Sequence, residues 1–214
     1  MRNSNLKHVF VLMTALVSLA GCAGKIHYPS YYVLNLPAPV PTLSPATPIL
    51  GSVAVREFES PRFLREGPIV YRASAEELGF YQYHRWAVDP RRTVTSAMIQ
   101  QMQSSGIFRS VDSYSGQTAE YLLTGTLDHL EELDQGSHVS IEAGLSARLI
   151  DTRTGGVLWR GALSKTVLLD QRSVPGVVTE MSGTVQSIVA GLVSSMQDRV
   201  SAASSPAIRA GSEQ

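Results

Sequence analysis

Side chains able to do chemistry are few in this chain, and they stand far apart. The motifs of common nucleophile, phosphate-binding and zinc sites do not occur: there is no Gly-x-Ser-x-Gly, no Walker loop, no Gly-x-Gly-x-x-Gly and no His-Glu-x-x-His. The histidines that could bind a metal have spacings unlike a ligand set, at His27, His84, His129 and His138. We therefore expect a protein that is not an enzyme and that holds neither a metal nor a cofactor.

Four acidic residues stand close together at Asp128, Glu131, Glu132 and Asp134. Paired carboxylates can serve acid–base catalysis or bind Ca²⁺, but this spacing is not that of an EF-hand loop. The cluster lies where a predicted strand runs into a turn at residues 134–137. We favour a solvated hairpin tip over a binding site.

Arginine and aromatic residues gather between Pro61 and Pro90, in a chain that is only 7% aromatic. Arg, Tyr and Trp are enriched at interface hot spots because planar rings and a forked guanidinium bury much area with few rotamers lost. The same composition also fits a segment whose rings half face the core and whose arginines are solvated. The candidate partner-binding residues are Arg65, Tyr71, Arg72, Arg85 and Trp86.

The N-terminal segment 1–21 has the pattern of an export signal. Arg2 and Lys7 precede an apolar run, 9–19, that is too short to span a bilayer as a helix. The run ends in Leu19-Ala20-Gly21-Cys22, which resembles the lipobox of bacterial lipoproteins, where the cysteine thiol receives a diacylglyceryl group. The alternatives are an ordinary secretory signal followed by a chance cysteine, or an uncleaved anchor.

Cys22 is the only cysteine in the chain, which favours the lipobox interpretation. Acyl chains on Cys22 would anchor the protein without a transmembrane helix. Ala23, in place of the aspartate that retains such lipoproteins at the inner membrane, implies delivery to the outer membrane, facing the periplasm. With this thiol lipidated, disulfides and cysteine-ligated metals are excluded.

Length and composition indicate one domain. The chain has 214 residues, of which 43% are hydrophobic, enough for a sizeable core. It carries 18 basic and 18 acidic residues, and removal of the signal would leave a slight acidic excess. Without a basic cluster the chain lacks the charge that nucleic-acid binding requires.

The periodic segments predict both helices and strands. A strand at 31–36 precedes a Pro-rich loop at 37–48, a strand at 49–58 and paired strands at 68–72 and 78–86. Asp89 and Pro90 predict the start of a helix that ends before Gly106, and a short strand follows at 107–111.

Strict alternation from Val139 to Leu149 predicts an antiparallel strand with one wet face, flanked in a meander by strands at 121–133 and 157–169. A final helix at 177–200 carries an apolar stripe that is typical of core packing rather than of cofactor binding. We expect an α+β fold, a mostly antiparallel sheet with two main helices packed on one face. The expected organisation is a signal peptide at 1–21, a lipid-anchored tether at 22–30, one domain at 31–200 and a disordered tail at 201–214.

Several short motifs occur in a fixed order, from Tyr31 to about Met196. They are Tyr31-Tyr32-x-Leu34 soon after the lipobox, Val53-Ala54-Val55, Pro61-x-x-Leu64, Ile69-Val70-Tyr71-Arg72, His84-Arg85-Trp86-Ala87, and Asp151-Thr152-x-x-Gly155 before Val157-Leu158-Trp159. This ordered set resembles the ABC-type transport auxiliary lipoproteins, the PqiC-like family of Gram-negative envelopes. Two stretches depart from the usual pattern of that family, Val88-Asp89-Pro90-Arg91 after Trp-Ala and Glu66-Gly67-Pro68 before Ile69.

The resemblance implies a non-enzymatic outer-membrane lipoprotein that works with an ABC transporter and a periplasmic protein of the mammalian-cell-entry (MCE) type. Such systems move phospholipids or other hydrophobic molecules between the two membranes. By position, the strand pair around Tyr71, Arg72, Arg85 and Trp86 would contact the periplasmic partner. A homo-oligomer is left open.

Three alternatives stay open at this point. The chain could be an envelope-assembly lipoprotein that supports an outer-membrane barrel or a cell-wall synthase. It could be a periplasmic enzyme with an unrecognised site, which would need a pocket lined by groups with perturbed pKa values. It could also carry lipid itself, in an apolar cavity between helix and sheet.

Overall fold

The computed structural model describes residues 27–39, 48–136, 138–170 and 172–204. The expected signal segment, Cys22, most of the tether, part of the Pro-rich loop and most of the tail lie outside these residues. The proposed division of the chain into signal, tether, domain and tail therefore stays a prediction.

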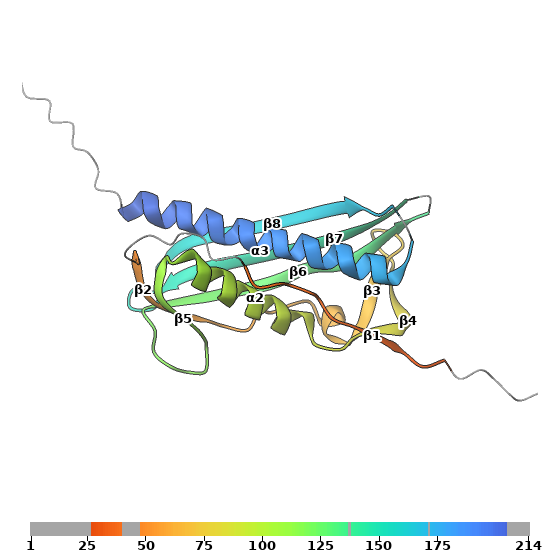
Figure 1. The fold of residues 1–214 in the computed structure, drawn as a ribbon, viewed down its shortest axis with the longest axis horizontal. Helices are drawn as coiled ribbons and strands as arrows, with labels where there is room; N and C mark the ends of the chain where they lie inside the picture. Colours follow the sequence, from red (N-terminus) through yellow and green to blue (C-terminus); the bar gives the residue numbers. More distant parts are fainter. Residues whose placement is uncertain (1–26, 40–47, 137, 171, 205–214) are drawn as a thin grey trace, which may run out of the picture.

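A meander of three long strands forms one side of the sheet (Figure 1). β6 (Tyr121–Gln135), β7 (His138–Asp151) and β8 (Val157–Leu168) pair antiparallel in sequence order. The alternation predicted for the middle strand is confirmed, since the odd-numbered residues of β7 from Val139 to Leu149 are all buried. The even-numbered residues Ser146 and Arg148 face the other side of the sheet.

Five further strands complete one eight-stranded sheet. The short elements are β1 (Ser30–Tyr32), β2 (Leu50–Val55), the 3₁₀ turn η2 (Arg62–Arg65), β3 (Pro68–Arg72), β4 (Leu78–Trp86) and β5 (Phe108–Ser113). β6 is long enough to pair with β7 along one edge and with two short strands, β3 and β2, along the other.

Parallel pairs join the outer strands to the meander. β2 and β3 each run parallel to β6, β1 runs parallel to β4, and β2 runs parallel to β5. The antiparallel pairs β6–β7 and β7–β8 are much longer, so the sheet is mostly antiparallel with some parallel pairs, and the predicted α+β class is confirmed. Parallel partners lie far apart in sequence, and strand patterns carry no information about such pairing.

Helix α2 (Pro90–Ser105) has the predicted bounds. The Asp89 side chain accepts a hydrogen bond from the Arg91 backbone N–H at 3.0 Å, and Pro90 occupies the first turn, where a missing N–H costs nothing. Gly106 ends the helix with a φ of 66°, a left-handed conformation that glycine adopts without strain. The capping residues therefore determine both ends of this helix.

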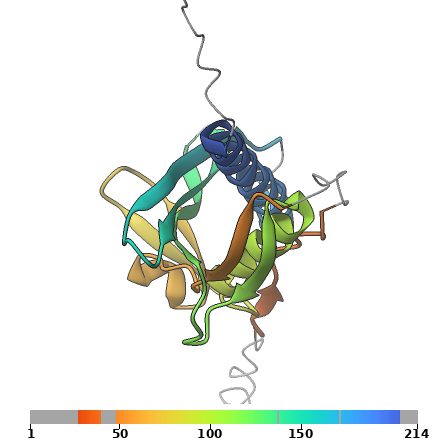
Figure 2. The same ribbon diagram turned by 90° about the vertical axis from the view of Figure 1, so that its left-hand side faces the viewer.

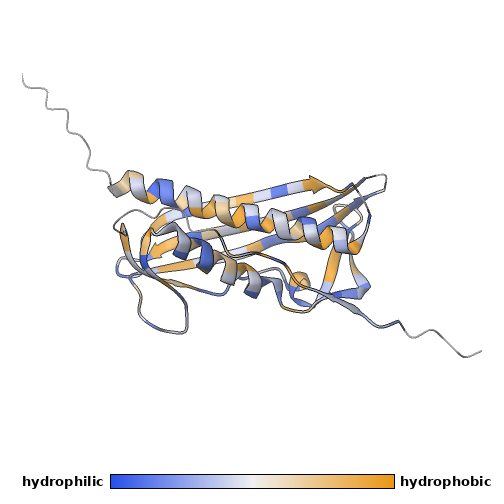
Figure 3. Ribbon diagram, in the orientation of Figure 1, coloured by the Kyte–Doolittle hydropathy of each residue, from blue (hydrophilic) through white to orange (hydrophobic). Residues whose placement is uncertain are grey.

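Helix α3 (Val174–Ser204) lies along β7 and β8 and contacts α2. Viewed along the long axis, the sheet curves around the helices (Figure 2), and apolar residues recur along α3 (Figure 3). The helix is long and apolar enough to cross a membrane by composition. Its stripe from Met181 through Val185 and Ile188 to Met196 is nevertheless buried in the protein core.

Two predicted strands are shorter than expected. β1 ends at Tyr32, after which Leu34 is buried and the Asn35 backbone N–H donates to the Ser182 hydroxyl of α3 at 3.1 Å. β2 ends at Val55, and Phe58 beyond it is fully buried. In both segments the apolar residues that suggested a longer strand instead pack from irregular backbone into the core.

Candidate functional site

The arginine and aromatic residues singled out in the sequence lie on β3, β4 and the preceding turn, at the end of the molecule where β1 enters (Figure 1). β3 and β4 pair antiparallel, as predicted, with an irregularity between Pro68 and Val70. β1 adds to the outer edge of β4, with Tyr31 opposite Arg85. The structure thus gathers the candidate residues in one region, but their side chains lie in different environments.

Arg72 is part of a buried charge network. Its Nε and Nη2 atoms lie 3.0 and 2.9 Å from Oε2 of Glu131, whose side chain is only 1% exposed. The other carboxylate oxygen of Glu131 lies 3.1 Å from Nδ1 of His129. Arg72 also donates to the Ala75 carbonyl at 3.1 Å. Most of its hydrogen-bonding capacity is therefore used inside the protein.

Tyr71 packs against Tyr81, which contacts a second buried acid, Glu132. The two rings meet edge to face with centroids 5.4 Å apart, and the Tyr81 hydroxyl donates to Glu132 at 2.8 Å. Burial raises the pKa of Glu132, and burial together with this hydrogen bond raises the pKa of Tyr81. Gly79 is required opposite Tyr71, because a Cβ there would lie 2.3 Å from the ring.

The prediction of a solvated hairpin tip is wrong for Glu131 and Glu132, which are 0% and 3% exposed. β3 pairs with this part of β6, with Tyr71 opposite Glu132, and Arg72 and Tyr81 contact the two carboxylates. A shift of register between Leu127 and His129 also interrupts the alternation of β6. Asp134, nearer the turn, pairs with Arg172.

The remaining candidates divide between core and surface. Trp86 belongs to the hydrophobic core, with 7% of its surface exposed. Arg65 is exposed at the end of η2, and Arg85 is half-buried and donates to the Glu66 carbonyl at 3.2 Å. Contact of these five residues with a partner stays a prediction, and Trp86 is not available on the surface for it.

Some exposed aromatic side chains at the same end were not among the candidate partner-binding residues. Tyr31 is 62% exposed, and Phe80 and Tyr83 are each 39% exposed. The ring of Tyr83 also lies 5.4 Å from that of His27. We call Tyr31, Tyr83 and Arg85 the docking edge. The Tyr31-Tyr32 motif was a usable signal, but alone it indicates only a strand.

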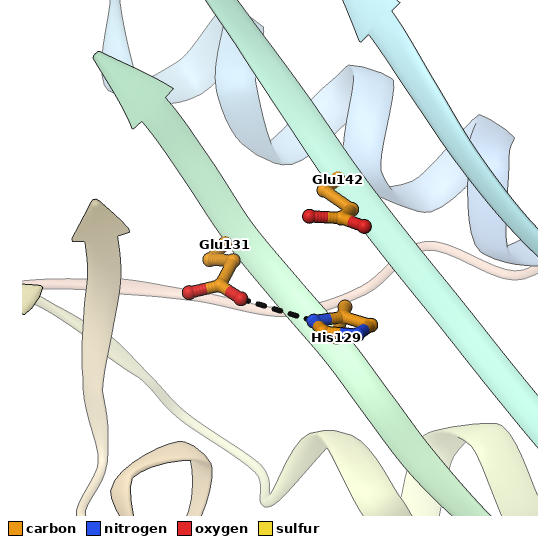
Figure 4. A group of neighbouring side chains, drawn as sticks. All are labelled: His129, Glu131 and Glu142. Carbon is orange, nitrogen blue, oxygen red and sulfur yellow. Dashed lines mark hydrogen bonds and ion pairs between the residues drawn. The ribbon is translucent and has the colours of Figure 1, made fainter. Parts of the chain in front are cut away.

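His129, Glu131 and Glu142 bring possible metal-binding atoms within 4.8 Å of one another (Figure 4). Both oxygens of Glu131 already accept hydrogen bonds, from Arg72 and His129, and Glu142 accepts one from Ser164 at 3.3 Å. A cation would have to compete with the guanidinium of Arg72 for the same carboxylate. These contacts favour a structural charge network over a metal centre.

Comparison with known structures identifies the fold. A protein from Xanthomonas campestris has 17% sequence identity and a TM-score of 0.69, over 82% of this chain and 99% of its own. A second structure, described only as an uncharacterized protein, has 13% identity and a TM-score of 0.62, over 78% of this chain and 97% of its own. At such identities the similarity establishes the fold alone.

No curated protein sequence matches the chain. The model of one protein family does match it, over residues 32–193, which include every described strand except the start of β1, together with α2 and most of α3. The description of that family is the ABC-type transport auxiliary lipoprotein component. The family resemblance seen in the sequence is thereby confirmed, and the chain belongs to the ABC-type transport auxiliary lipoprotein family.

Proposed function

We propose that this lipoprotein is a non-enzymatic docking component of the outer membrane. It connects the membrane to an MCE-domain periplasmic protein and its ABC transporter, which together move phospholipids or other hydrophobic molecules between the two membranes. Membership of the transport auxiliary family is the observation that carries the proposal. The acyl chains on Cys22 would supply the membrane anchor.

The position of the docking edge supports this role. β1 begins at Ser30, eight residues after Cys22, so a fully extended tether holds it within about 30 Å of the lipidated residue. Tyr31, Tyr83 and Arg85 offer two exposed rings and a guanidinium on neighbouring strands. This is the composition of an interface hot spot, close to the membrane anchor.

A non-enzymatic role agrees with how the buried charges are used. Glu131 and Glu132 would be candidates for acid–base chemistry by burial alone. Glu131 is held by Arg72 and His129, and Glu132 by Tyr81, in contacts that join β3 and β4 to β6. These contacts hold β3 and β4 against β6 and thereby stabilise the strands that carry the docking edge.

Cross-linking in native membranes tests the proposal. The tagged full-length protein is cross-linked and isolated, and the captured proteins are identified by mass spectrometry. We expect an MCE-domain protein, lost on Tyr31→Ala or Tyr83→Ala. Tyr114→Ala is the matched control, since Tyr114 is also 39% exposed but follows β5, away from the docking edge.

Trp86→Ala is unsuitable as a test of contact, because truncating a buried Trp costs about 3–5 kcal/mol of stability and would remove any partner indirectly. Capture of only a barrel-assembly protein or a cell-wall synthase would overturn the transport role and support the envelope-assembly alternative. Equal loss with Tyr114→Ala would overturn the assignment of the docking edge.

A further inference from the structure

Three arginines line one hollow on the solvent-facing side of the sheet, remote from the docking edge along β6. Arg56 follows β2, Arg148 lies on β7 and Arg160 on β8, around a hollow with a volume of about 520 Å³. We call this feature the arginine hollow. Its volume lies in the range of small-molecule sites in proteins.

Pairing between strands places the three cations in one row. Arg148 is directly opposite Arg160 across β7 and β8, and opposite Thr124 across β6 and β7. Arg56 adjoins Thr124, because its backbone N–H donates to the Leu123 carbonyl at 2.9 Å. The row therefore crosses four neighbouring segments of the sheet.

Within the described part of the chain, none of the three arginines that line the hollow forms an ion pair with an acidic side chain. Like charges directly opposite each other on a sheet are destabilising. An Arg–Arg pair without a carboxylate between its members is thus a structural cost that a bound anion would remove.

The acidic residues on the rim reduce the positive charge only in part. Glu57 is engaged elsewhere, 3.6 Å from Arg91 and 3.6 Å from Arg92. Glu59 is the other acidic residue that lines the hollow. Three guanidinium groups therefore face one acidic group that is not already shared with the arginines of α2.

Two of the arginines are held in place by neighbouring side chains. Nε of Arg148 donates to Oγ1 of Thr124 at 3.0 Å, and the guanidinium of Arg56 stacks on the Tyr114 ring, 5.0 Å from its centroid. Ser146 and Thr126, which are opposite each other across β6 and β7, each add a hydroxyl group to the same lining. Pre-positioned donors lose less entropy when a ligand binds.

We propose that the arginine hollow binds a phosphate group, either as the headgroup of a phospholipid or as a free phosphate compound. Several forked guanidinium groups match an anion with three or more oxygen acceptors, which favours phosphate over a single carboxylate. The site does not depend on the docking proposal, because it lies on other strands and binds its ligand without a protein partner.

Binding is measured on purified full-length protein in a neutral detergent, by titration calorimetry with three probes. The probes are inorganic phosphate, dihexanoyl-phosphatidylglycerol below its micellar concentration, and dihexanoyl-phosphatidylcholine as the zwitterionic counterpart. We expect phosphate-dependent binding that weakens with salt. Arg148→Gln and Arg160→Gln should each weaken it by roughly tenfold or more.

Arg109→Gln is the matched control, since Arg109 is an exposed arginine on β5 outside the hollow. Binding of phosphatidylglycerol without inorganic phosphate would identify a lipid headgroup as the source, and the reverse would identify a free phosphate compound; both support the site. No binding of either at millimolar concentration, or an equal loss with Arg109→Gln, would overturn the proposal.

Thermal stability gives a second measurement, which can be made without knowing the natural ligand. Without phosphate, Arg160→Gln should raise Tm by about 1–3 °C at low salt, because it removes the opposed like charge. Added phosphate should stabilise the unmodified protein more than the variant. A phosphate effect that is the same in both proteins would contradict binding at the arginine hollow.

Discussion

Removal of the Arg72 side chain should destabilise the protein by about 3 kcal/mol. Arg72→Ala deletes a charge-assisted hydrogen bond to Glu131 at 3.0 Å and a second ion-pair contact at 2.9 Å, and it leaves a carboxylate that is 1% exposed. Removing one member of a buried ion pair, which leaves the other charge buried without its partner, costs about 3–5 kcal/mol. We take the lower end, because Arg72 is 26% exposed and His129 still contacts the Glu131 carboxylate.

The assay is equilibrium unfolding in urea, followed by tryptophan fluorescence, since Trp86 and Trp159 are both buried. Arg62→Ala is the matched control. Its ion pair with Glu66 has side chains that are 88% and 48% exposed, and its loss should change the free energy of unfolding by less than about 0.5 kcal/mol.

A double-mutant cycle separates the pair from the individual side chains. Arg72→Ala and Glu131→Ala should be less than additive, with a coupling of about 1.5 kcal/mol or more. Destabilisation by Arg72→Ala below about 1 kcal/mol, or additive effects in the cycle, would refute the reasoning. Either result would mean that the ion pair contributes little to the attachment of β3 to β6.

Three further predictions concern stability. Glu132→Gln should make the free energy of unfolding less dependent on pH. Burial raises the pKa of Glu132 above 4.5, so the contribution of Glu132 to stability is complete below pH 4.5 and declines as the pH rises through the raised value. Urea unfolding between pH 4 and 7 will measure this decline. Gly125→Ala should cost about 1–3 kcal/mol of stability, because the new Cβ would lie 2.4 Å from the Phe58 ring. Gly183→Ala should stabilise by about 0.5–1 kcal/mol, because the space around Gly183 on the helix surface is open. Thermal unfolding should therefore show a lower Tm for the first variant and a higher Tm for the second. Asp89→Ala should lower the free energy of unfolding in urea by about 1–2 kcal/mol. Burial opposes the charged form of Asp89, but hydrogen bonds from Arg91 lower the pKa of Asp89 overall. The loss should therefore be present above pH 3.8 and vanish as the pH falls through the lowered pKa.

Local patterns were sufficient for much of the fold. The period of two along β7, the turns on either side of it, and the cap and stop residues of α2 each act within a few residues. They predicted the meander and the bounds of the helix correctly. The resemblance of residues 19–22 to a lipobox is similarly local, and it stays a prediction.

Candidate site residues were harder to interpret, because their roles depend on contacts between distant segments. Arg72 and Glu131 are 59 positions apart, and Tyr81 and Glu132 are 51 apart. Composition indicated an interface or a half-buried segment and could not separate the two. The structure places Trp86 in the core and Tyr83 on the surface.

The sequence by itself determined the α+β class, the three-stranded meander, the capped helix and the family resemblance, because periodicity, turn chemistry and short motifs act locally. Only the tertiary structure decided which charges are buried and which arginines share a surface. Parallel pairing of β3 with β6 brings Arg72 to Glu131, and the register of β7 with β8 places Arg148 opposite Arg160. Such register is fixed by packing between segments distant in sequence, and no single segment encodes it.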